Sequence, residues 1–254
     1  MKRMILAAIA AAGAGALGLM AQQPMAKSQD ELKAVQALFG AYQSGNNDAV
    51  IASADALLTK YADTQFKEIA LSLEAGAYQA KGDWAKQQIY LEQVLQVNPK
   101  SSDAQIKLAE IVIKHTHEND LDKDDRLARS DKLLSDALEN LKTWAKPSPQ
   151  IPDDKWEQEK KAMRAQAEEL QGLVALDRKK YDDAAACFKT AIGDDPQPAY
   201  QAQLATALQD GGKNDEAIAL CDKILADPQA HPAIKQYVQG IKAAATKAKS
   251  ASGK

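Results

Sequence analysis

A two-helix unit of about 34 residues recurs along this chain, and a repeat of that length constrains the fold more than any other feature of the sequence. The clearest copy covers residues 165–196, where Gly172 lies in a first helix and a second helix begins at Tyr181 and stops before Pro196. Residues 68–99 repeat the same layout. A single unit cannot bury its apolar face alone, so the repeat predicts a solenoid in which neighbouring helix pairs stack.

The composition indicates that these repeats are helical. Hydrophobic residues make up 45% of the chain but aromatic residues only 5%, because alanine and leucine supply most of the apolar side chains. Both residues have high helix propensity. We therefore predict an all-α fold, an α-solenoid of antiparallel helix pairs with about five repeats and a C-terminal capping helix. The expected pairs cover about 28–61, 65–99, 101–144, 153–196 and 198–227, and the capping helix begins after His231.

Equivalent residues of the last two pairs lie nearly one repeat apart. Ala184 and Ala217 are 33 residues apart, and Pro196 and Pro228 are 32 residues apart. We expect the two alanines where helices approach each other closely, since a larger side chain would overpack such a position. The prolines should end the second helices, because proline disfavours the helical conformation of the residue before it.

A proline-rich segment divides the repeats into two groups. Three prolines fall within residues 147–152, and proline both fixes φ and lacks the N–H that a helix needs. We predict a stiff, extended spacer there. It separates N-terminal helix pairs at 28–146 from C-terminal helix pairs and the capping helix at 153–245.

The two ends of the chain predict an export signal and a disordered tail. Lys2 and Arg3 precede a short apolar stretch, residues 4–20, which is typical of a secretory signal over residues 1–21. A cleaved signal of this bacterial type predicts a periplasmic or secreted protein. An uncleaved anchor remains the alternative, although the stretch is shorter than the ~20 residues that span a bilayer. Residues 246–254 are rich in lysine, alanine and serine and predict disorder.

The two cysteines and two of the tryptophans allow predictions about which side chains pack or bond together. An oxidising compartment would permit a disulfide between Cys187 and Cys221. Helices that neighbour each other in a stack lie ~8–10 Å apart, whereas a disulfide needs Cα atoms within ~7 Å. We therefore favour two buried thiols over a disulfide. Trp144 and Trp156 flank the spacer and are expected to pack together across it.

These helix pairs resemble the tetratricopeptide repeat family. The resemblance rests on small residues in the first helices, residues that open the second helices, inter-helix packing positions and proline terminators. The small residues are Ala75, Gly172 and Ala205, and the second helices open at Trp84, Tyr181 and Asn214. The inter-helix packing positions are Ala184, Ala217, Leu91, Phe188 and Cys221, and the terminators are Pro99, Pro196 and Pro228. The match is strongest over 68–99 and 165–228. The resemblance implies a protein-interaction module without catalytic activity or cofactor, whose protein or peptide partner binds in a groove lined by the first helices.

The side chains expected to face this groove are mixed in character and only weakly charged. A groove of that kind suits an extended peptide or a helix of a protein partner. Tyr42 is the best anchor among them, since aromatic side chains carry much of the energy of an interface. The candidate partner-binding residues are Phe39, Tyr42, Gln79, Glu110, Lys114, Gln209 and Asp210.

An insertion in the third pair supplies an alternative function. His115 and His117, with Glu118 and Asp120 nearby, could bind zinc or copper in a metal-binding protein or a metal-dependent enzyme. Alternating acids at 120–125 also resemble part of a calcium loop, although Asp125 stands where the turn glycine is needed. The simpler interpretation is a helix start enriched in aspartate, because carboxylates favour a helix N-terminus.

Other classes of function lack support in the sequence. No nucleophile motif, phosphate loop or glycine fingerprint occurs. The net charge is −3, and it becomes −5 without Lys2 and Arg3, which does not suit nucleic-acid binding. The sequence therefore favours an exported, non-catalytic scaffold, with a role in cell-envelope assembly as one form of that function.

Overall fold

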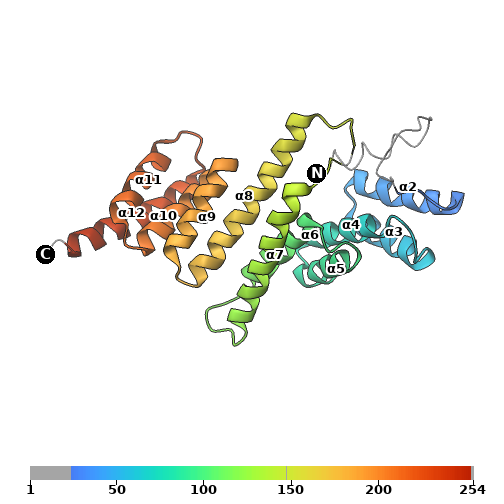
Figure 1. Ribbon diagram of the computed structural model, residues 1–254, viewed down its shortest axis with the longest axis horizontal. Coiled ribbons are helices and arrows are strands. Elements are labelled where there is room, and N and C mark those ends of the chain that lie inside the picture. Colours follow the sequence, from blue (N-terminus) through green and yellow to red (C-terminus); the bar gives the residue numbers. More distant parts are fainter. Residues whose placement is uncertain (1–23, 147, 253–254) are drawn as a thin grey trace. The chain divides into compact units, whose positions relative to one another are not determined.

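The computed structural model describes residues 24–146 and 148–252, and the predicted export signal lies outside these ranges. Over the described residues the chain forms eleven α-helices and no strand, which confirms the all-α prediction (Figure 1). None of these helices is both long and apolar enough to span a membrane. The helices are α2 (Gln29–Ser44), α3 (Asn47–Lys60), α4 (Lys67–Ala80), α5 (Trp84–Val97), α6 (Ser102–Lys114), α7 (Lys123–Thr143), α8 (Asp153–Asp177), α9 (Tyr181–Asp194), α10 (Pro198–Asp210), α11 (Asn214–Ala226) and α12 (Pro232–Ser252).

Turn chemistry sets where the second helices of the pairs begin. Gly45, Gly82 and Gly212 adopt the left-handed conformation, with φ between 71° and 78°, just before a second helix starts. The side chains of Asn46 and Asp83 then accept hydrogen bonds from the backbone N–H three residues further on, which caps α3 and α5. Three second helices open at the predicted residues and stop two residues before the predicted prolines: Trp84 and Pro99, Tyr181 and Pro196, Asn214 and Pro228.

Packing divides the chain into two compact units. Unit 1 extends to Ile111 and includes Lys142–Trp156, whereas unit 2 comprises Val112–Leu141 and Glu157–Lys254. The division therefore does not follow the predicted boundary at 147–152, because the spacer belongs wholly to unit 1. In unit 1, α3 packs between α2 and α4, and α5 packs on α4. In unit 2, α10 packs against α9, α11 and α12.

Small residues allow the helices of unit 2 to approach closely. Gly172 of α8 faces the ring of Phe188 on α9, and a Cβ atom at Gly172 would lie only 2.5 Å from that ring. Ala184 and Ala217 are completely buried, as predicted for close helix contacts. The pair α8–α9 is also joined by a bidentate ion pair, in which the guanidinium of Arg164 donates to Asp194 at 2.8 and 2.9 Å.

An aspartate–lysine pair recurs at equivalent places in the repeats. In each case the aspartate is the second residue of α3, α9 or α11, and the lysine follows it by 31 to 34 residues. The N···O distances are 2.5–2.6 Å, and the side chains are largely exposed, so each pair adds little stability. Because these pairs recur at equivalent positions, they show how the repeats align with one another. The pairs are Asp48 with Lys81, Asp182 with Lys213, and Asp215 with Lys249.

The segment between α7 and α8 is anchored by aromatic packing. The rings of Trp144 and Trp156 lie 4.2 Å apart between centroids and are tilted by 49°, which confirms that they pack together. Ile151 is buried, and its N–H donates to the carbonyl of Ser148 in a turn. Lys146 forms an ion pair with Asp153 at the start of α8. Residues 148–152 thus form a folded turn around these contacts and not the extended link expected from the prolines.

The C-terminal segment differs from its prediction as well. Helix α12 continues to Ser252, so residues 246–252 are helical where the composition predicts disorder. Alanine and lysine are good helix formers, and Lys249 pairs with Asp215 of α11. Ala245, the residue directly before the predicted tail, is completely buried. These contacts give the last turns of α12 a support that the local composition does not reveal.

Candidate protein-binding surface

The predicted groove residues all lie on first helices of their pairs. Phe39 and Tyr42 are on α2, Gln79 is near the end of α4, Glu110 and Lys114 are on α6, and Gln209 and Asp210 end α10. The first four belong to unit 1 and the last three to unit 2. Each unit therefore presents its own part of the predicted surface.

Phe39 is a correction to the predicted set. Its side chain is only 4% exposed and lies in a core cluster with Leu38, Val50 and Leu57. The helical spacing of α2 places both Leu38 and Phe39 on the face that meets α3, so the ring stabilises the pair and leaves little surface for a partner. The wide apolar face of a core helix includes adjacent positions, which sequence periodicity alone does not separate.

Tyr42 and Gln79 are the accessible members of the set in unit 1. Tyr42 is half-buried and packs against the same core cluster as Phe39. Burial raises the pKa of its phenol above 10, so the hydroxyl stays protonated at neutral pH and can donate a hydrogen bond. Gln79 is exposed, and its backbone carbonyl accepts from Gly82 in the turn after α4. Glu110 is half-buried and already takes part in an interaction within the molecule.

In unit 2, α10 contributes the exposed Asp210 and the half-buried Gln209. Lys114 is exposed and makes an interaction inside the molecule. The neighbouring helix α12 adds a further aromatic residue, Tyr237, which is 53% exposed. Its hydroxyl lies 2.9 Å from the Thr206 hydroxyl of α10. A tyrosine held in this way offers a rigid aromatic face at low entropic cost.

Glu74 on α4 is a buried charge that sequence reasoning missed. The side chain is completely buried, and within the described residues neither carboxyl oxygen has a partner of good hydrogen-bond geometry. Burial raises its pKa to about 7, while the Tyr90 hydroxyl opposes the rise and Asp55 adds to it. Tyr90 stacks on Tyr78, with ring centroids 5.3 Å apart. The signal for this site was present in the repeat, since Glu74 precedes the packing residue Ala75 as the apolar Leu204 precedes Ala205.

The connection between α6 and α7 is built from internal contacts. The N–H of His117 donates to Asp120 at 2.8 Å, and Glu118 pairs with Lys123. Among the described residues, no group of three or more His, Cys, Asp or Glu side chains is arranged to hold a metal ion. The histidine pair thus gains no support as a metal site. Two of the acids that suggested a calcium loop, Asp124 and Asp125, lie in the first turn of α7, as the simpler interpretation predicts.

Both cysteines are free thiols in the structure. Cys221 is buried among apolar residues of α10, α11 and α12, and Cys187 is half-buried on α9. Burial raises the pKa of both thiols, that of Cys187 to about 11 with further contributions from Glu168 and nearby aspartates. At neutral pH both groups are therefore protonated and weakly nucleophilic.

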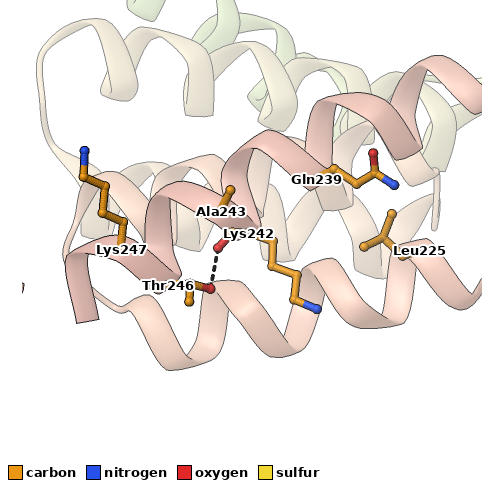
Figure 2. Close-up of a pocket in the computed structure, with 6 residues that line it drawn as sticks. All are labelled: Leu225, Gln239, Lys242, Ala243, Thr246 and Lys247. Atoms are coloured by element: carbon orange, nitrogen blue, oxygen red, sulfur yellow. Dashed lines mark hydrogen bonds between the residues drawn. The ribbon is translucent and has the colours of Figure 1, made fainter. Parts of the chain in front are cut away.

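A shallow groove lies between α11 and α12 on unit 2 (Figure 2). Leu225 of α11 and Ala243 of α12 supply apolar surface, and two lysines stand at its edge. The Thr246 hydroxyl donates to the backbone carbonyl of Lys242 at 2.8 Å, which fixes it within its own helix. The lining residues are Leu225, Gln239, Lys242, Ala243, Thr246 and Lys247.

Comparisons with known proteins agree with this architecture. Residues 169–232 match the family model described as tetratricopeptide repeat. A search of curated protein sequences gave no match. Among solved structures, the fold is similar to that of a thermophilic TPR protein from Thermus thermophilus, with 18% identity, a TM-score of 0.53, and coverage of 83% of this chain and 98% of that one.

Two structures of MamA proteins are also similar. A MamA protein shares 15% identity at a TM-score of 0.58, over 77% of this chain and 90% of that one. MamA from Desulfovibrio magneticus shares 12% identity at the same TM-score, over 78% of this chain and 94% of that one. At such low identity these likenesses establish the fold alone.

Proposed function

Because the chain is a tetratricopeptide repeat protein, we propose that it is an exported, non-catalytic scaffold that binds a protein partner through the exposed faces of its first helices. The observation that carries the proposal is the repeat architecture itself. Stacked helix pairs leave one face of each first helix uncovered, and such extended faces are the usual binding surfaces of solenoid proteins.

The accessible residues of these faces favour a peptide or helix as the bound element. Tyr42 and Tyr237 offer aromatic contact area, whereas Gln79 and Gln209 can hydrogen-bond a partner's backbone. Asp210 adds a negative charge at the end of α10 and disfavours acidic segments. The mixed chemistry suits recognition of a polar segment with a few apolar anchors.

Export is supported by the order of residues at the start of the chain. Two cations, an apolar stretch and small residues at about position 21 are the three parts of a secretory signal. A repeat scaffold on the far side of a membrane would hold together proteins of the cell envelope. We therefore propose envelope assembly as its setting, with a protein complex and not a small molecule as the bound species.

Crosslinking followed by affinity purification from native cells tests this function directly. We expect a specific protein partner to copurify, and fractionation should recover both proteins outside the cytoplasm. The partner can then be titrated against Tyr42→Ala and Lys114→Ala. A true anchor residue costs ~2 kcal/mol or more on truncation, which corresponds to a roughly 30-fold weaker Kd.

Matched variants distinguish the loss of a binding contact from a general effect of the substitution on the protein. Tyr42→Phe keeps the ring and should retain most of the affinity, and Lys189→Ala removes an exposed lysine from the second helix α9. Unchanged affinity in both Tyr42→Ala and Lys114→Ala, with circular dichroism intact, would contradict binding at the first helices. Recovery of the protein in the cytoplasm with its N-terminus intact would contradict export.

A further inference from the structure

Leu121 is the most exposed large apolar residue of the described chain. It lies in the connection between α6 and α7, and its side chain is fully accessible to solvent. Single exposed leucines are common on protein surfaces and need no explanation by themselves. Leu121 differs because the backbone that carries it is fixed on both sides by hydrogen bonds and ion pairs.

Four hydrogen bonds hold this loop in one conformation. The carboxylate of Asp120 accepts from the His117 N–H at 2.8 Å, and the Asp120 N–H donates back to the His117 carbonyl at 3.1 Å. On the other side of Leu121, the guanidinium of Arg126 donates to Asp122 at 2.7 Å. Arg126 also donates to the carbonyl of His115 at 3.0 Å, which ties the start of α7 to the end of the preceding helix. The loop is therefore ordered before any partner binds, which lowers the entropic cost of docking.

The loop surrounds its leucine with negative charge. Residues 117–125 contain five acids and one lysine, and Asp120 and Asp122 are the direct neighbours of Leu121. The hydrogen bond from the His117 backbone lowers the pKa of Asp120, so this carboxylate is ionised throughout the neutral range. A complementary surface must combine a small apolar depression with positive charge.

The groove between α11 and α12 has that combination (Figure 2). Its apolar surface comes from Leu225 and Ala243, and its edge carries Lys242 and Lys247. Lys247 has no ion-pair partner in the described part of the chain, whereas Lys242 pairs with Asp222 at 2.5 Å. Helix α12 contains four lysines and no acidic residue; Lys242 and Lys249 pair with Asp222 and Asp215 of α11, which leaves Lys247 as the groove lysine that no carboxylate of the described chain neutralises.

We propose that the Leu121 loop of one molecule docks into the α11–α12 groove of a second copy of the same chain. Leu121 would cover the apolar surface of Leu225 and Ala243, while Asp120 and Asp122 would face Lys247 and Lys242. Because the two surfaces differ, the contact is heterologous, and a pair of molecules joined in this way still has one unused groove on the first molecule and one unused loop on the second. The chain therefore self-associates head to tail, independently of any partner on its first helices.

Sedimentation of the purified full chain over a range of concentrations tests the first consequence. The small area of a single loop predicts weak association, so the average mass should rise with concentration and fall again in 0.5 M salt. Leu121→Ser and Lys247→Glu should each reduce association at least tenfold. Both residues are exposed, so both variants should keep the helical circular dichroism signal. Lys189→Glu makes the same change of charge on α9 and should associate like the wild type.

Mixing the two variants gives the decisive result. The Leu121→Ser chain keeps its groove and the Lys247→Glu chain keeps its loop, so an equimolar mixture should form a 1:1 dimer and nothing larger. Wild-type chains that remain monomeric at all concentrations would overturn the proposal. It would equally be overturned by variants that associate like the wild type, or by a mixture that stays monomeric.

Discussion

At the scale of single residues, Glu74 shows how one buried group links the repeat to a pH response. The folded state keeps the pKa of this carboxyl near 7, whereas the unfolded chain gives it an ordinary value of about 4.5. Below pH 4.5 both states bind the proton, so burial has no electrostatic penalty there. Between pH 4.5 and about 7 the unfolded chain releases this proton while the folded state still holds it, so the free energy of unfolding falls across that range and levels off above it.

We predict that Glu74→Gln flattens this dependence. A shift from 4.5 to about 7 corresponds to a loss of about 3 kcal/mol in the free energy of unfolding across that range, since one pKa unit is worth ~1.4 kcal/mol. Urea titrations at pH 5 and pH 8 should show a smaller loss for the variant than for the wild type. Glu74→Leu should be more stable than the wild type at pH 8, because Leu204 fills the equivalent position of α10. Parallel pH profiles for wild type and Glu74→Gln would contradict the assignment.

The contact between Gly172 and Phe188 gives a second test at this scale. A methyl group at Gly172 would lie 2.5 Å from a completely buried ring, and overpacking of this kind costs ~1–3 kcal/mol. Gly172→Ala should therefore lower the free energy of unfolding of unit 2, although alanine is the better helix former. Gly240→Ala is the matched control in α12, where no atom lies near the added Cβ. There the higher helix propensity should dominate and raise stability by ~0.5–1 kcal/mol.

At the scale of elements, local sequence rules predicted the repeats well and the exceptions poorly. Glycine turns, capping residues and terminal prolines act within a few residues, so α5, α8, α9 and α11 begin where the sequence indicated. The folded turn at 148–151 depends on the packing of Trp144 against Trp156, twelve residues apart, and the helical end of α12 depends on the ion pair of Lys249 with Asp215, 34 residues apart. Such contacts leave no local pattern, and composition therefore suggested an extended spacer and a disordered tail.

The same reasoning applies to the candidate site. Helical periodicity placed all seven predicted residues on first helices, but it did not distinguish the buried Phe39 from the accessible Tyr42 three positions later. The charge of Glu74 was visible in the sequence, and comparison with Leu204 would have identified it. The periodic pattern of the repeat reflects helix packing, and a partner-binding surface adds no periodic signal of its own.

We predict that the tryptophan pair protects the turn between α7 and α8 from proteolysis. Trp156 is buried and Trp144 covers it, so Trp144→Ala should loosen the turn that holds Ile151. Proteinase K, which has broad specificity, should then cleave within residues 148–152 several times faster than in the wild type, while cleavage inside α8 and α9 stays slow. Mass spectrometry of the first fragments measures this directly. If residues 148–152 are cleaved at the same rate in both proteins, the contact between the two tryptophan rings does not stabilise the turn.

At the scale of the whole molecule, the two compact units predict that stability is regional. Helices of a repeat protein contact mainly their neighbours, so a local change acts mostly on the unit that contains it. The chain has a natural reporter for this, because its three tryptophans, Trp84, Trp144 and Trp156, all belong to unit 1. Their fluorescence follows the unfolding of unit 1, whereas far-ultraviolet circular dichroism follows the helices of both units.

This arrangement leads to a prediction in which two probes disagree. Gly172→Ala should move the circular dichroism transition in urea to lower concentration and leave the tryptophan transition almost unchanged, because the overpacked ring lies in unit 2. Glu74→Leu should do the reverse at pH 8, raising the tryptophan midpoint and only part of the circular dichroism curve. Each variant thus serves as the control for the other. Transitions that coincide for both probes in both variants would mean that the units unfold as one cooperative block, since two-state unfolding makes every probe report the same curve.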